Sequence, residues 1–208
     1  MTKHTALDCR GLACPGPVLR CLEALEKYAP ETLEIQVDDQ AARENVTRLL
    51  TGKGYSVTAE EAPGLILLRA ARQNAAAQPA APAGTACAVA VSQALAQDKI
   101  LAFITADAIG RGSDELGGKL MLAFLATLPE LGKSLWRIVL LNGGVKLACE
   151  GHPALEKLEA LAASGVSILV CGTCLNFFEL LEKKRVGETT NMLDVVTSLG
   201  LAGKVIQT

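Results

Sequence analysis

An Ala- and Pro-rich stretch at residues 73–84, QNAAAQPAAPAG, is the feature that most constrains what this chain can fold into. Its side chains offer little apolar surface to bury, and this composition is typical of a semi-rigid linker. The segment that follows, up to residue 97, is more apolar, and it either continues the linker or forms a short helix. A chain of 208 residues interrupted here is expected to form two small domains, residues 1–72 and 98–208, joined by a linker at residues 73–97.

The apolar residues before the linker follow the spacing of two helices and four strands. Val18, Leu22 and Leu25 recur at helical intervals, with charged residues between them. Residues 33–37 alternate between apolar and polar side chains, as a half-buried strand does. The expected order is βαβαββ, with elements at residues 5–8, 15–28, 33–37, 41–50, 55–59 and 65–69. This order predicts a two-layer α+β sandwich, with both helices on one face of a four-stranded sheet.

After the linker, continuous apolar runs alternate with helical patterns. The runs at residues 100–105, 137–141 and 166–171 are typical of buried parallel strands. Helical spacing occurs at residues 113–128, 153–164 and 193–199, and a last strand is expected at residues 204–206. The alternation predicts an α/β layered domain with a mostly parallel sheet, whose functional residues lie at the carboxyl ends of the strands.

Charge and composition exclude several classes of protein. A net charge of -2 and a pI of about 5.8 argue against a nucleic-acid binder, which normally carries a basic face. The first residues are polar, and no apolar run approaches the ~20 residues of a membrane helix. We therefore expect a cytoplasmic protein with no membrane partner, no nucleic-acid partner and no cofactor. In that compartment the seven cysteines should be free, catalytic or metal-binding thiols, without a disulfide framework.

Cys14 stands where a glycine-bearing turn meets the first predicted helix, directly before Pro15. Proline suits the first helical turn, and the free amides and positive dipole end of that turn favour an anion. A thiolate is such an anion and is the nucleophilic form of cysteine, so Cys14 is the expected catalytic thiol. Cys21 falls near the apolar stripe of the helix and is expected in the core. Cys9 is either incidental or a resolving partner for an oxidised Cys14.

The segment LDCRGLACPGPVL, residues 7–19, resembles the signature of the TusA/SirA family. Members of this family share a βαβαββ sandwich and a Cys-Pro-x-Pro motif, which residues 14–17 match. In that family the motif cysteine accepts sulfane sulfur from a donor, such as a cysteine desulfurase, and hands it to an acceptor. The resemblance implies the same carrier role for Cys14.

Cys171 and Cys174 form a C-x-x-C pair directly after an apolar strand, which suggests a redox or sulfur-handling thiol pair. Cys149 ends another segment in which a strand is followed by a turn. Parallel strands would therefore bring three cysteines to one edge of the sheet. Two alternatives stay open. Cys149-x-x-His152 with Cys171-x-x-Cys174 has a spacing that a structural zinc accepts, or the thiols are simply buried at strand ends. We expect no metal, because His152 precedes Pro153 at a helix start and an α/β core of this size folds without zinc.

Four further segments, at residues 110–117, 142–145, 171–175 and 186–192, resemble those of DsrE-like domains. The full order, TusA-like then DsrE-like, is similar to that of the YedF family of selenium metabolism. This resemblance implies handling of sulfur or selenium, transfer between the two domains and a homo-oligomer formed through the second domain. Residues 112–120 lack the Gly-Lys-Ser/Thr of a phosphate-binding P-loop, so that function is excluded.

Two functions from different classes follow from these patterns. The first is a sulfurtransferase-like carrier, in which Cys14 is the nucleophile and Cys171 or Cys174 is the acceptor or resolving thiol. The second is a non-catalytic regulatory or scaffold protein of sulfur or selenium metabolism, with a zinc site in its second domain. Only His4 and His152 could act as a histidine general base, but persulfide exchange needs little base once the thiolate has formed.

Overall fold

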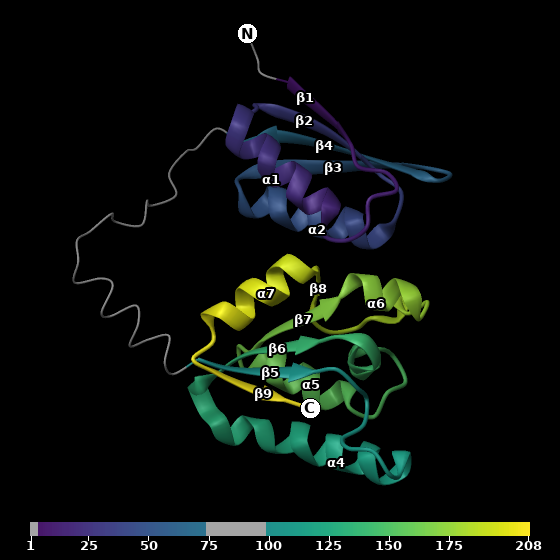
Figure 1. Ribbon diagram of the computed structural model, residues 1–208, viewed down its shortest axis with the longest axis vertical. Helices are drawn as coiled ribbons and strands as arrows, with labels where there is room; N and C mark the ends of the chain where they lie inside the picture. The colour runs from purple at the N-terminus through teal and green to yellow at the C-terminus, as the bar shows by residue number, and fades with distance from the viewer. Residues whose placement is uncertain (1–3, 74–98) are drawn as a thin grey trace, which may run out of the picture. The chain divides into compact units, whose positions relative to one another are not determined.

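The computed structural model describes residues 4–73 and 99–208, and the chain falls into two compact units, Met1–Pro82 and Ala83–Thr208 (Figure 1). Residues 74–97 of the predicted linker lie outside the described residues. The division into a carrier domain at 1–72 and a second domain at 98–208 therefore stays a proposal, and each unit is considered by itself. Within the described ranges no helix is both long and apolar enough to cross a membrane.

The first unit is the predicted α+β sandwich. Its elements are β1 (His4–Asp8), α1 (Gly16–Tyr28), β2 (Thr32–Val37), α2 (Gln40–Gly52), β3 (Tyr55–Ala62) and β4 (Leu65–Arg72). The strand order is β1-β2-β4-β3, in which β1 runs parallel to β2 and the other neighbours are antiparallel. The expected element order is therefore confirmed, and the hairpin strands are longer than predicted.

The alternation along β2 decides which face of this sheet is covered. Leu33, Ile35 and Val37 are buried beneath the helices, and α1 and α2 lie on the same side of the sheet (Figure 1). Glu34 points to the opposite face, where its carboxylate accepts a hydrogen bond of 3.0 Å from Arg69. A strand with period two thus gives this domain one apolar face and one charged face.

The second unit is an α/β layered domain whose sheet is parallel throughout. Its strands are β5 (Ile100–Ile104), β6 (Leu135–Leu140), β7 (Ser167–Cys171), β8 (Glu188–Thr190) and β9 (Lys204–Gln207), in the order β8-β7-β6-β5-β9. Its α-helices are α4 (Asp114–Thr127), α5 (Leu155–Ala163), α6 (Gly172–Phe177) and α7 (Met192–Leu201). Short 3-10 helices lie at η1 (Leu128–Ser134), η2 (Asn142–Ala148) and η3 (Leu181–Lys183). The sequence did not predict β8, α6 or the 3-10 helices.

Alternate residues of these strands enter two hydrophobic clusters on opposite faces. Ile138 and Leu140 pack with the α4 and α5 side chains, represented by Met121 and Leu158. Val139 belongs to a smaller cluster with α7. In Figure 1, α4 and α7 accordingly lie on opposite sides of the strands. Because all neighbouring strands are parallel, their carboxyl ends share one edge, where the loops after β5, β6 and β7 begin.

Candidate functional site

Cys14 is an exposed thiol in the loop that connects β1 to α1. Two carboxylates hold this loop. Asp8 at the end of β1 accepts two hydrogen bonds from the Arg10 guanidinium, at 2.9 and 2.7 Å, and Asp38 accepts the Gly11 N–H at 2.6 Å. The hydrogen bonds from Arg10 lower the pKa of Asp8 to about 2, so its carboxylate is charged throughout the neutral range. The loop therefore presents Cys14 to solvent from a fixed support.

The start of α1 differs in detail from the sequence expectation. Pro15 is the N-cap residue, so Cys14 lies one residue further from the helix than predicted, and the Cys14–Pro15 peptide bond is cis. Pro15 and Pro17 have no N–H to donate, and the Gly16 N–H already donates to the Ala13 carbonyl at 2.7 Å. The first turn thus presents fewer free amides to Cys14 than expected. The feature of Cys14 that the structure does show is its exposure to solvent.

Cys174 lies at the carboxyl edge of the parallel sheet, within a different environment. Cys171 ends β7 and is 5% exposed, whereas Cys174 is half-buried in α6. The Cys174 sulfur accepts a hydrogen bond from the Cys171 thiol and a second from the Asn142 N–H, at 3.2 Å. These two donors, of which the Cys171 thiol has the larger effect, lower the pKa of Cys174 to about 6 against the opposing effect of burial. Cys174 is therefore mostly thiolate at neutral pH.

The Asn142 amide reaches Cys174 because the chain after β6 turns sharply against β5. Asn142 has a positive φ of 45°, a conformation that Asn tolerates better than most residues. Gly144, two residues later, packs against β5, and a Cβ at this position would lie 2.6 Å from the Ile104 carbonyl oxygen. Only glycine fits this approach, so the Asn-Gly-Gly sequence positions a donor that sequence reasoning missed.

An ion pair joins two loops at the same edge. Lys146 in η2 contacts the Asp107 carboxylate at 3.1 Å, and its ammonium group lies 5.4 Å from the centre of the Phe178 ring. Asp107 belongs to the loop after β5 and Phe178 follows α6, so Lys146 connects segments that follow β5, β6 and β7. The rule that carboxyl ends of parallel strands meet could have suggested Asp107, but nothing in the sequence indicated its partner.

Comparison with known proteins identifies the first unit. Residues 5–69 match the family profile described as "Sulfurtransferase TusA". The chain carries a TusA-family domain. The profile stops before the linker and says nothing of the second unit.

Two solved structures are similar to this chain. A SirA-like protein from Desulfitobacterium hafniense is 27% identical, over 32% of this chain and 95% of its own, with a TM-score of 0.30. The ychN protein from E. coli is 22% identical, over 53% of this chain and 98% of its own, with a TM-score of 0.43. A search of curated proteins finds no match.

Within the TusA-family domain, the other two cysteines form a buried pair. Cys9 and Cys21 are both 0% exposed, and their thiols are hydrogen-bonded to each other. This contact lowers the pKa of Cys9 and raises that of Cys21. The core placement expected for Cys21 is confirmed. The resolving role considered for Cys9 stays a hypothesis. In the structure the Cys9 thiol contacts Cys21.

Cys149 does not share the hydrogen bonds of the Cys171–Cys174 pair. Its thiol donates to the Val145 carbonyl at 3.3 Å, and burial raises its pKa. It lines an open hollow of about 380 Å³ together with His152, whose pKa burial lowers and whose Nδ1 accepts the Ala154 N–H. Among residues 4–73 and 99–208, no three His, Cys, Asp or Glu side chains are grouped to hold a metal ion. The four-ligand zinc arrangement is therefore not formed there.

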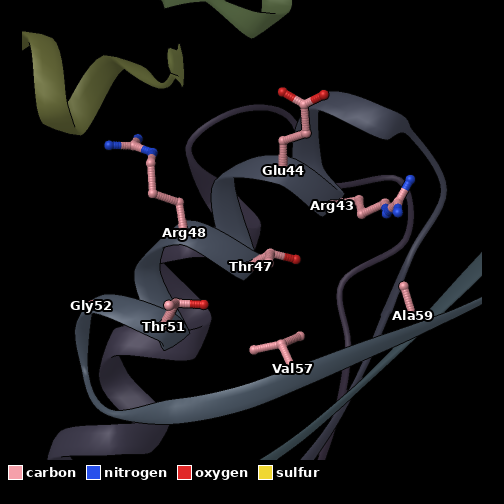
Figure 2. Close-up of a pocket in the computed structure, with 8 residues that line it drawn as sticks. All are labelled: Arg43, Glu44, Thr47, Arg48, Thr51, Gly52, Val57 and Ala59. Atoms are coloured by element: carbon pink, nitrogen blue, oxygen red, sulfur yellow. The ribbon is translucent and has the colours of Figure 1, made fainter.

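A larger hollow of about 680 Å³ lies between α2 and β3 of the TusA-family domain (Figure 2). Arg48 and Glu44 project from α2 beside it, while Val57 and Ala59 line its β3 side. Arg43, also in its lining, is paired with Glu61 at 2.8 Å. None of the lining residues is a cysteine, so the hollow offers no thiol to hold sulfur covalently.

Proposed function

We propose that this chain is a sulfurtransferase-like carrier that takes sulfane sulfur or selenium onto Cys14 and passes it to the Cys171–Cys174 pair. The observation that carries the proposal is the exposure of Cys14, at a supported loop in a domain that matches the TusA sulfurtransferase family. A carrier thiol has to meet a persulfide on another protein. An exposed sulfur in a loop suits such an encounter, and a buried one does not.

The transfer itself is a thiolate displacement. The Cys14 thiolate attacks the outer sulfur of a donor persulfide, forms the new S–S bond and leaves the donor cysteine as a thiolate. No oxidant is consumed, because the sulfane sulfur only changes its partner. Donor and acceptor proteins, with a cysteine desulfurase as the donor type, are therefore the partners that this role requires.

Selenium moves through the same thiolate chemistry. A selenium atom on Cys14 would form a selenosulfide by an equivalent displacement. The likeness of the domain order to the YedF family favours selenium metabolism as the setting, in the cytoplasm. In this proposal the second domain is DsrE-like, supplies the acceptor thiols and also forms the homo-oligomer.

Intact mass spectrometry after incubation with a persulfide-loaded cysteine desulfurase tests the carrier role. The desalted full chain should gain the mass of one sulfur atom on the peptide that contains Cys14, and reduction should remove it. Cys14→Ser should lose this gain. Cys149→Ser is the matched control and should keep it, because Cys149 is buried against Val145.

A Cys14→Ser chain whose first 72 residues load as much sulfur as the parent would refute the carrier assignment. A parallel incubation with a selenide-generating donor, read by elemental mass spectrometry, addresses the cargo. Selenium that binds to the parent chain and is lost in Cys14→Ser supports a selenium role. Sulfur loading without any selenium binding restricts the proposal to sulfur.

A further inference from the structure

Cys171 and Cys174 form a dithiol whose two members have different access to solvent. Cys174 is half-buried and can be reached from outside, whereas Cys171 is 5% exposed at the end of β7. The Cys174 sulfur accepts hydrogen bonds from the Cys171 thiol and from the Asn142 N–H. An incoming persulfide would therefore meet Cys174 first, as a stabilised thiolate.

The position of Cys171 relative to a persulfide on Cys174 decides what happens next. The Cys171 thiol contacts Sγ of Cys174, which becomes the inner sulfur once a second sulfur is attached. Attack on the outer sulfur would only move the persulfide to Cys171. Attack on the inner sulfur joins the two cysteines and expels the outer sulfur. The contact in the structure is with the inner position.

We propose that the Cys171–Cys174 pair is a sulfide-releasing site, which reduces the sulfane sulfur of a Cys174 persulfide to hydrosulfide. Cys174 is the receiving thiol and Cys171 is the thiol that resolves the persulfide. The substrate class is a persulfide, and the selenium analogue would release hydroselenide by the same route. This activity goes beyond carrying, because the cargo leaves the protein in reduced form.

Both steps balance without an outside oxidant. In the first, the Cys174 thiolate takes the outer sulfur of R–S–SH, which leaves R–S⁻ and a Cys174 persulfide. The persulfide ionises, and the Cys171 thiol proton passes to its terminal sulfur while the Cys171 sulfur bonds to Sγ of Cys174. The S–S bond to the terminal sulfur breaks, HS⁻ departs and a Cys171–Cys174 disulfide remains. One sulfur is reduced by two electrons, and the two cysteines supply them.

Repeated turnover then requires a dithiol reductant that converts the disulfide back to two thiols. A single turnover requires none, and this allows the proposal to be tested without one. The inference rests on the proposed function only for the origin of the persulfide. A small-molecule persulfide can replace Cys14 as the donor, so the two proposals can fail separately.

The test uses the full-length chain with Cys14→Ser, and with Cys87→Ser to remove the cysteine that lies outside the described residues. The protein is reduced and then freed of reductant. Glutathione persulfide is added, the sulfide released into the reaction is measured against a protein-free control, and the protein is then desalted for its intact mass. The expected result is release of one sulfide per chain and the loss of two hydrogen masses, with a Cys171–Cys174 disulfide in the peptide map. Cys149→Ser in the same background should behave identically.

Two variants separate the roles of the pair. Cys171→Ser should accumulate the persulfide on Cys174, while sulfide release falls to the level of a protein-free control. Cys174→Ser should neither load nor release. The near-ultraviolet spectrum of each variant, compared with that of its parent, reports whether the fold has been kept.

Three results would overturn the proposal. The first is a persulfide that persists on Cys174 with Cys171 intact, and the second is a Cys171→Ser protein that releases sulfide as fast as the parent. The third is a parent that never loads Cys174. Each of these leaves sulfur loading on Cys14 of the unaltered protein unaffected, so the carrier proposal is judged by its own experiment.

Discussion

Cys14 in the TusA-family domain is exposed, whereas Cys174 in the second unit is half-buried and accepts two hydrogen bonds. Prolines at positions 15 and 17 remove amide donors beside the first thiol. The Cys171 thiol and the Asn142 amide supply donors to the second. The difference separates two needs of sulfur transfer, because meeting another protein requires access, while stabilising a thiolate requires fixed donors. In this chain Cys14 provides the access, and Cys174 has the fixed donors.

The largest expected effect is the difference in access to a bulky thiol reagent between Cys14 and the two buried cysteines of its own domain. Cys14 is exposed, so it should react in the native protein without any local unfolding. Cys9 and Cys21, both 0% exposed, should react slower by orders of magnitude, because they need local unfolding. Peptide-resolved alkylation over time, with and without denaturant, measures this. Equal native rates for Cys14 and Cys21 would contradict the comparison.

The next effect is the pH dependence of Cys174. Its pKa is lowered to about 6, so the thiolate dominates above that pH and is lost below it. In acid the alkylation rate of Cys174 should fall by about tenfold per pH unit, because only the thiolate reacts. The rate profile on the Cys174 peptide, with a small reagent, gives the midpoint. A midpoint near the ordinary cysteine value of 9.0 would remove the electrostatic half of the comparison.

Removing the larger donor should move that midpoint. Cys171→Ala deletes the hydrogen bond that lowers the pKa of Cys174 most, so this pKa should rise from about 6 toward its ordinary value. Cys171→Ser is the matched control, since its hydroxyl can still donate, and it should shift the midpoint less. The pH dependence of alkylation of the Cys174 peptide is measured for both variants. If the alanine variant keeps a midpoint near 6, Cys171 is not the main cause of the acidity.

The smallest effect concerns the backbone turn that supplies the Asn142 amide. Gly144→Ala would place a Cβ 2.6 Å from the Ile104 carbonyl oxygen, so the turn has to shift. A cost of about 1–3 kcal/mol in the free energy of unfolding is expected for such overpacking. Gly143→Ala is the control, because its Cβ meets only ordinary contacts of 3.6 Å or more. Urea unfolding of both variants compares them, and equal stabilities would show that the close approach is not needed.

The sequence predicted those parts of the molecule that depend on local patterns. Apolar alternation along β2 and the apolar runs of β5, β6 and β7 gave the layers, because periodicity follows directly from strand geometry. Strand β8, Glu188–Thr190, was missed, since three residues are too few to show a period. The Cys14 motif was evident because its residues are consecutive.

The chemistry of the second site was predicted less completely. The C-x-x-C spacing identified Cys171 and Cys174 but could not say which of them is the acidic thiol. The acidity of Cys174 arises mainly from the Cys171 hydrogen bond and further from the Asn142 amide, which is distant in sequence and arrives through the Gly144 turn. The contact between Cys9 and Cys21 was missed for the same reason, because it joins the end of a strand to the middle of a helix. Tertiary contacts of this kind have no local pattern.

The parallel sheet of the second unit has a consequence for protein engineering. Its hydrophobic clusters lie along the strands, while the loop after β5, helix η2 and helix α6 all leave from one edge. A residue such as Thr173 is exposed in α6 and contributes nothing to either cluster. A library confined to such positions would vary the reactivity of the thiol pair while the scaffold stayed intact. The fold thus separates what must be kept for folding from what is free to be redesigned.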